Sequence, residues 1–188
     1  FELAATEVTV AQYGAYARET GSRLPTQPHW SDHDHPVVNL SWNEAAAYCG
    51  SIGGRLPTEA EWELAARGGE NERYPAGEAF DPEGVNGMSV TGKDRWGFTA
   101  PVGSFPANGF GLHDMTGNVW EWTADWYREG PGWTQPTLMD PAPDSASYLK
   151  TVRGGSWDSS PRNLRITRRE GLSAGGRHNL YVGIRCAR

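Results

Sequence analysis

The chain has 188 residues, 37% of them hydrophobic, which is enough for one domain with a buried core. Its net charge of −6 is unevenly spread: residues 151–188 hold eight Arg against Asp158 and Glu170, so this segment carries +6 and the other 150 residues carry −12. An acidic body with one basic segment argues against a nucleic-acid-binding protein. The sequence contains no signal peptide and no apolar run of the roughly 18 residues that a membrane-spanning helix needs. The compartment, cytoplasm or cell surface, stays open. Because the first residue is Phe rather than Met, we expect a further N-terminal segment or fused domain.

Three capping boxes mark helix starts in the first third of the chain. In each box, a Ser or Thr hydroxyl and a Glu or Gln three residues later satisfy free N–H groups of the first helical turn. The boxes are formed by Thr9 with Gln12, Ser41 with Glu44, and Thr58 with Glu61. Glycines predict where these helices end: at Gly21, at residues 53–54 and at residues 68–69.

After residue 69 the chain is dense in Gly, Pro, Asn, Asp and Trp and has no long periodic segment. Short runs of β-branched and aromatic residues predict strands at residues 99–105, 120–126, 150–154 and 181–186. Helices followed by irregular loops and short strands indicate a single α+β domain over residues 1–188.

The C-terminal segment has fixed-looking ends and an unpatterned interior. Residues 153–157, Arg-Gly-Gly-Ser-Trp, and residues 183–188 bracket a stretch, residues 158–180, with neither helical nor strand periodicity. Exposed loops on a rigid scaffold often carry function. The segment is therefore either a ligand-binding surface or an ordinary long surface loop.

Several sequence blocks resemble the sulfatase-modifying-factor domain, which is the formylglycine-generating-enzyme type. They occur in the family's order and cover nearly the whole chain, at residues 7–13, 35–45, 54–69, 109–122, 153–157 and 183–186. The resemblance implies an elaborated C-type lectin-like fold, loop-rich, with few helices and short mixed or antiparallel strands. Unrelated functions share this fold, so function has to be argued from the site.

The resemblance also bears on the cysteines. In the copper-dependent oxidases of this family, two redox Cys follow the Arg-Gly-Gly-Ser block, and the matching positions here are Ser159 and Leu164. Neither can supply a thiolate, so formylglycine generation is not expected, nor is a redox or nucleotide cofactor. Composition alone allows two free thiols or one disulfide. The family often has a structural disulfide where Cys49 and Cys186 stand, which predicts that they are neighbours; whether they are oxidised depends on the compartment.

A second resemblance is to the variable proteins of diversity-generating retroelements, which use the same lectin-like fold. Residues 153–157, 163–165, 169, 177 and 182–183 match the constant frame of their C-terminal segment. The resemblance implies a bacterial, non-enzymatic protein that displays a hypervariable surface, residues 158–184, to a protein or other macromolecular ligand. The positions that match diversified ones are Asp158, Ser159, Ser160, Arg162, Ile166, Arg168, Glu170, Gly171, Leu172, Ser173, Gly175, His178, Leu180, Tyr181 and Ile184, the last standing where Phe is usual.

Variation of this kind requires that the varied side chains point to solvent while anchors such as Trp157 and Leu164 stay buried. The positive charge of the segment predicts a preference for acidic partners that weakens with salt.

Structural calcium is the one cofactor that the family resemblance implies. Carboxylate or amide side chains together with backbone carbonyls suit a hard cation. The resemblance implies two such sites, and a calcium ion at either site would stabilise the loops around it. The matching ligand sets are Asp114, Gly117, Val119 and Glu121 and, with a shorter connecting segment than in the enzymes, Asn86, Gly87, Asp94 and Trp96.

Two other functions stay open. Some relatives work beside an iron-binding helical domain to make sulfoxides of histidine derivatives, and others modify siderophores, so this chain is alternatively an enzyme or enzyme-accessory domain. As a structural or assembly domain, it would instead bury its C-terminal loop against a fixed partner.

Overall fold

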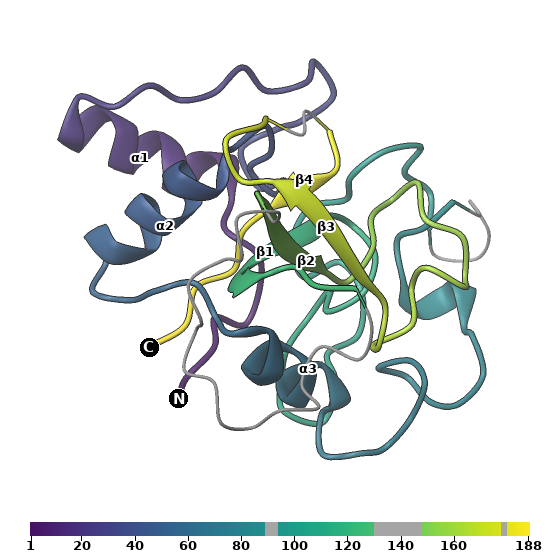
Figure 1. The fold of residues 1–188 in the computed structure, drawn as a ribbon. Helices are drawn as coiled ribbons and strands as arrows, with labels where there is room; N and C mark the ends of the chain where they lie inside the picture. The colour runs from purple at the N-terminus through teal and green to yellow at the C-terminus, as the bar shows by residue number, and fades with distance from the viewer. Residues whose placement is uncertain (89–93, 130–147, 178–179) are drawn as a thin grey trace.

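The computed structural model describes residues 1–88, 94–129, 148–177 and 180–188 (Figure 1). Its described elements are the α-helices α1 (Val10–Thr20), α2 (Trp42–Ser51) and α3 (Glu59–Arg67), the 3-10 helix η1 (Pro82–Gly84), and the strands β1 (Trp120–Trp126), β2 (Leu149–Arg153), β3 (Arg169–Ser173) and β4 (Val182–Gly183). Long irregular segments connect them, so the α+β, loop-rich class is confirmed.

All three helices begin at the capping boxes that the sequence predicts. In each box the Ser or Thr hydroxyl accepts the N–H of the third helical residue, whose own side chain accepts the N–H of the cap. α1 and α3 end at Gly21 and Gly68, whose φ angles of 68° and 60° lie in the left-handed region that glycine adopts without strain. α2 ends at Ile52, one residue before the predicted pair of glycines.

The four strands form one curled sheet in the order β3-β2-β1-β4. β1 pairs antiparallel with β2 and parallel with β4, and β2 pairs antiparallel with β3. The predicted strand at residues 99–105 does not form, and the one at residues 181–186 is reduced to β4. β3 was not expected, because its side chains are mostly half-buried and do not alternate between buried and exposed.

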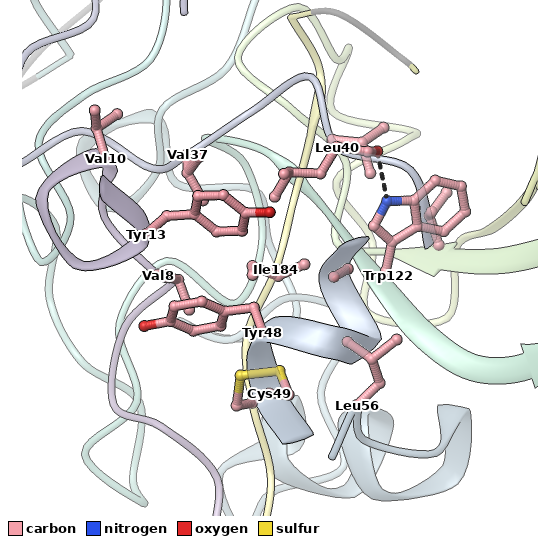
Figure 2. Packing of buried hydrophobic residues seen from close by; sticks show 14 of the residues in the cluster. Val8, Val10, Tyr13, Val37, Leu40, Tyr48, Cys49, Leu56, Trp122 and Ile184 are labelled. Carbon is pink, nitrogen blue, oxygen red and sulfur yellow. Dashed lines mark hydrogen bonds between the residues drawn. A yellow bond between two sulfur atoms is a disulfide. The ribbon is translucent and has the colours of Figure 1, made fainter. Parts of the chain in front are cut away.

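The main core lies where α1 and α2 pack against the sheet (Figure 2). The rings of Tyr13 and Tyr48 stack with centroids 5.3 Å apart, which joins the two helices. Trp122 of β1 is fully buried and donates its indole N–H to the Leu40 carbonyl at 3.2 Å. Figure 1 shows these helices to one side of the sheet and α3 below it.

A second core forms beneath α3 and includes Trp62, Met115 and Ile166, all at most 2% exposed. It therefore combines a helix residue, a residue of the central loops and one from the C-terminal segment.

Cys49 of α2 and Cys186 near the C-terminus are joined in a disulfide with a Cα–Cα separation of 5.5 Å. The two ends of the chain lie side by side (Figure 1), since Glu2 and Arg188 exchange backbone hydrogen bonds of 3.0 and 2.9 Å. None of the helices in the described part of the chain is long and apolar enough to cross a membrane.

Candidate functional site

A buried ion network holds the base of the C-terminal segment. Arg153, at the end of β2, is fully buried and donates to Glu59 at 2.7 Å and to Glu63 at 2.5 Å, both on α3. Arg169, at the start of β3, binds the same Glu59 at 2.8 Å. Two positions of the predicted constant frame are thus fixed to the scaffold by charge-assisted hydrogen bonds, the stronger kind in proteins.

A second buried pair fixes the end of the chain. Arg185 donates to Glu121 of β1 at 2.8 Å, and the side chains are 0% and 1% exposed. Glu121 also accepts the indole N–H of Trp62 at 2.6 Å. Arg185 in addition binds the backbone carbonyls of Ala4 and His113 at 2.8 and 2.7 Å.

Several of the Arg side chains that give residues 151–188 their positive charge are paired within the protein. Arg153, Arg169 and Arg185 bind carboxylates within the scaffold, and Arg177 pairs with Glu44 of α2 at 2.5 Å. Four of the eight Arg are therefore paired with carboxylates of the scaffold. These paired Arg side chains therefore do not support the expected preference for acidic partners.

The structure sorts the predicted ligand positions by exposure. Asp158, Arg162, Ser173, Gly175 and Tyr181 are exposed, and half-buried positions are Ser160, Arg168, Glu170, Gly171, Leu172 and Leu180. His178 lies outside the described residues. The exposed members form the accessible part of the predicted surface, which we call the display face.

Three predicted ligand positions are buried, so the expectation that they point to solvent is wrong. Ile184 is fully buried in the main core and Ile166 in the second core. Ser159 is 6% exposed, and its hydroxyl accepts the N–H of Ser156 at 3.0 Å, closing the turn after the Arg-Gly-Gly-Ser block. The loop sequence looks unpatterned because buried and exposed positions follow no fixed period.

Two half-buried positions are also constrained by packing. A Cβ added at Gly171 would lie 2.3 to 3.0 Å from the side chain of Tyr127, so a larger residue there would have to displace the ring. Leu172 packs against the main core. By contrast, a Cβ at Gly175 meets nothing within 4 Å. Gly175 can therefore vary freely, whereas Gly171 cannot.

Ser159 and Leu164, which match the redox Cys of the oxidases, are both buried and lie around Gly155. A Cβ at Gly155 would lie 2.9 Å from Leu164 Cδ2 and 3.3 Å from Ser159 Oγ. These two buried positions hold a hydroxyl and an isobutyl group. Both cysteines of the chain are in the disulfide instead.

An aromatic row borders the display face, made of Trp30, Phe98, Trp157 and Tyr181. Neighbouring ring centroids are 3.9, 5.0 and 5.4 Å apart along the row. Phe98 and Tyr181 are 39% and 38% exposed. Trp30 and Phe98 were not predicted from the sequence, because they are distant from the C-terminal segment and only the fold brings them near Trp157.

The first predicted calcium set does not fit an ion in this arrangement. Both oxygens of Glu121 accept from Arg185, at 3.0 and 3.1 Å, so a guanidinium already neutralises this carboxylate. Asp114 accepts the N–H of Gly103 at 2.6 Å, and burial raises the pKa of its carboxyl group.

The second calcium set fits better. Asn86 donates its amide NH₂ to Asp94 and to the Phe98 carbonyl, each at 3.1 Å, and both are acceptors, so the amide orientation is fixed. Its buried Oδ1 then has no hydrogen-bond partner. The Asp94 carboxylate is 2% exposed and also accepts the backbone N–H groups of Gly87 and Trp96, at 3.0 and 3.1 Å. A buried amide oxygen without a donor beside a buried carboxylate suits a hard cation.

The whole chain, residues 1–188, matches the sulfatase-modifying factor enzyme 1-like domain. A formylglycine-generating enzyme of Thermomonospora curvata is 38% identical over 196 residues, covering 95% of this chain and 63% of the relative. The serine/threonine-protein kinase pkn1 of Chlamydia caviae is 40% identical over 158 residues, covering 82% of this chain and 24% of the relative. The chain thus spans less than two thirds of these relatives.

Solved structures share the fold. PvdO from Pseudomonas aeruginosa superposes with a TM-score of 0.84 at 27% identity, covering 98% of this chain and 78% of that one. Treponema denticola variable protein 1 gives 0.76 at 23% identity, covering 98% and 82%. The U1 variant of Major Tropism Determinant gives 0.55 at 17% identity, covering 98% and 49%. The last two likenesses show the fold alone. From the match over its full length, the chain belongs to the sulfatase-modifying factor enzyme 1-like domain family.

Proposed function

We propose that this domain is a non-catalytic recognition module that presents the display face and the aromatic row to a protein or other macromolecular ligand. In this proposal a retroelement diversifies the exposed positions of residues 158–184. One observation carries it: the segment combines a frame locked by buried ion pairs with exposed positions such as Arg162, Ser173 and Gly175.

The chemistry of the face suits a macromolecular partner. Tyr and Trp supply rigid contact area, and small residues such as Ser173 and Gly175 leave room for different ligand shapes. The row reaches outside the C-terminal segment through Trp30 and Phe98. Recognition would therefore combine the fixed anchors Trp30, Phe98 and Trp157 with variable neighbours that include Tyr181.

An enzymatic role is the second candidate, favoured by relatives that are named formylglycine-generating enzymes. The chemistry at Ser159 and Leu164 argues against that reaction, because neither side chain can be a copper ligand or a redox thiol. Formylglycine generation would therefore need redox groups from outside this chain.

We also propose a structural calcium ion held by Asn86 and Asp94, with the carbonyls of Gly87 and Trp96 completing the ligand set. When bound, the ion would neutralise the buried carboxylate and fix the loop. That loop carries Phe98, whose carbonyl binds Asn86, so the ion would also steady the aromatic row.

The proposed function is tested by sequencing the DNA around the gene for a near-copy of codons 153–188. We expect a repeat that differs only at adenines, beside a reverse transcriptase. The differences should fall on the codons of exposed positions such as Arg162, Ser173 and Tyr181, and spare those of Ile166 and Ile184. The absence of such a repeat, or differences concentrated at the codons of buried residues, would overturn the proposal. An enzyme-accessory domain or a domain with a fixed partner would then be favoured.

A further inference from the structure

Three side chains hold the loop that carries Phe98 of the aromatic row. Asn86 donates to the Phe98 carbonyl at 3.1 Å, and Asn118 accepts the backbone N–H two residues further on at 3.0 Å. The third is His35, whose ring nitrogen Nδ1 lies 2.9 Å from the hydroxyl oxygen of Thr99. Of these three side chains, only that of His35 changes its charge between pH 5 and 8.

The His35 side of this contact is fixed to the start of α1. The His35 carbonyl accepts the N–H of Val10 at 2.9 Å, and the His35 N–H donates to the Asp32 carbonyl at 3.1 Å. His35 is 8% exposed and Thr99 is 4% exposed, so the contact joins two buried side chains. Because the backbone of His35 is held in this way, its neutral ring gives the Phe98 loop a firm point of attachment.

The position of Trp30 depends in turn on the Phe98 loop. The rings of Trp30 and Phe98 stack with centroids 3.9 Å apart. The buried indole N–H of Trp30 has no hydrogen-bond partner in the part of the chain that the structure describes. Stacking therefore holds this ring in the row, and a displacement of Phe98 would remove its support.

The surroundings of His35 disfavour a charged ring. Burial is the main cause that lowers the pKa of His35 from its ordinary 6.5, and the carboxylates of Asp34 and Asp32 oppose this effect. Both Asp residues are exposed neighbours in its own loop, whereas Val10 and Thr99, which contact it from α1 and from the Phe98 loop, are uncharged. The stability that depends on the neutral ring is therefore complete above pH 6.5 and is lost as the pH falls below it.

We propose that His35 makes the aromatic row sensitive to acid. Protonation moves the ring away from Thr99 towards solvent, loosens Phe98 against Trp30 and so weakens the binding of a ligand at the row. The weaker ligand binding rests on the proposed function, whereas the movement of the row does not. The DNA repeat tests the proposed function and the pH response of the row tests the movement, so the two proposals fail separately.

The test follows the Trp30 indole N–H, the Phe98 amide and the His35 ring protons by NMR from pH 7.5 to pH 5 in calcium-free buffer. We expect all three signals to shift with one common midpoint below pH 6.5. His35→Gln should abolish the shifts of Trp30 and Phe98, because Gln does not titrate but keeps a side-chain amide that can bond Thr99. The matched control is His29→Gln, which should leave these shifts unchanged. His29 is exposed and meets the Trp30 ring edge to face, with centroids 5.1 Å apart.

The native chain provides a check that needs no variant at the buried His35, because the midpoint of the Phe98 amide must equal that of the His35 ring protons. Shifts that persist in His35→Gln and disappear in His29→Gln would report only the exposed His29 ring, and would overturn the proposal. A Phe98 amide that does not shift over this pH range, or that shifts with a midpoint different from that of the His35 ring, would also overturn it.

Discussion

Arg185 and Glu121 form an ion pair in which neither side chain reaches solvent, with 2.8 Å between the guanidinium and the carboxylate. The pair connects the C-terminal chain to β1, one of the two inner strands of the sheet. It also takes up a carboxylate that the family resemblance assigns to calcium. This contact therefore fixes the end of the C-terminal segment. It also occupies a carboxylate that would otherwise be available to a metal ion.

Arg185→Met is expected to lower the free energy of unfolding by about 3–5 kcal/mol, because it leaves Glu121 as an uncompensated buried charge. Guanidinium chloride denaturation measures the loss. The matched control is Arg55→Met, which breaks the Arg55–Glu61 pair, whose side chains are 46% and 20% exposed. That pair should be worth less than about 1 kcal/mol, and equal losses would contradict the special role of the buried pair.

Ile166→Ala and Tyr181→Ala should separate scaffold from surface. Ile166 is fully buried, so its truncation is expected to cost about 2–5 kcal/mol of stability. Tyr181 is 38% exposed and should cost less than about 1 kcal/mol. Thermal denaturation of both variants checks the order, and a Tyr181 variant as unstable as the Ile166 variant would make Tyr181 a packing residue.

Calcium should raise the melting temperature of the native chain, by an amount that grows with the logarithm of the free ion concentration. Asp94→Asn is expected to remove this response, because it takes away the charged ligand of the second set. Glu121→Gln should lower stability yet keep the response. A response lost in the Glu121 variant and kept in the Asp94 variant would reverse the assignment of the site.

Acid should weaken the cap of α3. The hydrogen bond from Arg55 is the main cause that lowers the pKa of Glu61 to about 2 from its ordinary 4.5. A depressed carboxyl pKa gives stability that is present above pH 4.5 and lost as the pH falls towards 2. Because Arg55 is nearly half exposed, the contribution is about 1 kcal/mol or less.

Urea denaturation at pH 5 and pH 2.5 checks this expectation against Glu61→Gln, which keeps a side-chain acceptor at the cap. The native chain should lose its advantage over the variant at the lower pH. A constant difference between the two would mean that the charge of Glu61 contributes nothing.

Removing the disulfide should destabilise the fold. The Cys49–Cys186 bond closes a loop with a sequence separation of 137, and loops of this size give the bond about 2–5 kcal/mol through the restricted unfolded state. The double replacement by Ala, compared with the oxidised native chain in denaturation, measures it. If the replacement leaves the free energy of unfolding unchanged, the disulfide does not contribute to stability.

The helices could be predicted from sequence because their signals are local. A hydroxyl, a Glu or Gln three residues later and a closing glycine determine where a helix starts and ends with little help from the rest of the chain, as α1 and α3 show. β1 was predictable for a similar reason, since Trp120, Trp122, Thr123 and Trp126 all lie within one seven-residue segment. The family resemblance likewise rests on contiguous blocks.

The site could be predicted only in outline. The frame around residues 158–184 is visible in the sequence, but the burial of Ile166 and Ile184 is not, because nothing local distinguishes them from exposed apolar residues such as Tyr181. In the aromatic row, Trp30 contacts Phe98 and Phe98 contacts Trp157, and the members of each pair are about 60 to 70 positions apart in the sequence. Such contacts depend on how the loops cross, not on any period.

The sequence by itself therefore determined the helix boundaries, the family and the absence of a redox cysteine pair, all of which are properties of residue identity and short-range spacing. Only the tertiary structure decided where the arginines go: Arg153 to Glu59 and Glu63, and Arg185 to Glu121. The net charge of a segment does not show whether an Arg lies at the surface or is paired with a carboxylate in the interior. Burial and pairing depend on contacts between residues that are far apart in the chain. These contacts determine which residues belong to the scaffold and which to the display face.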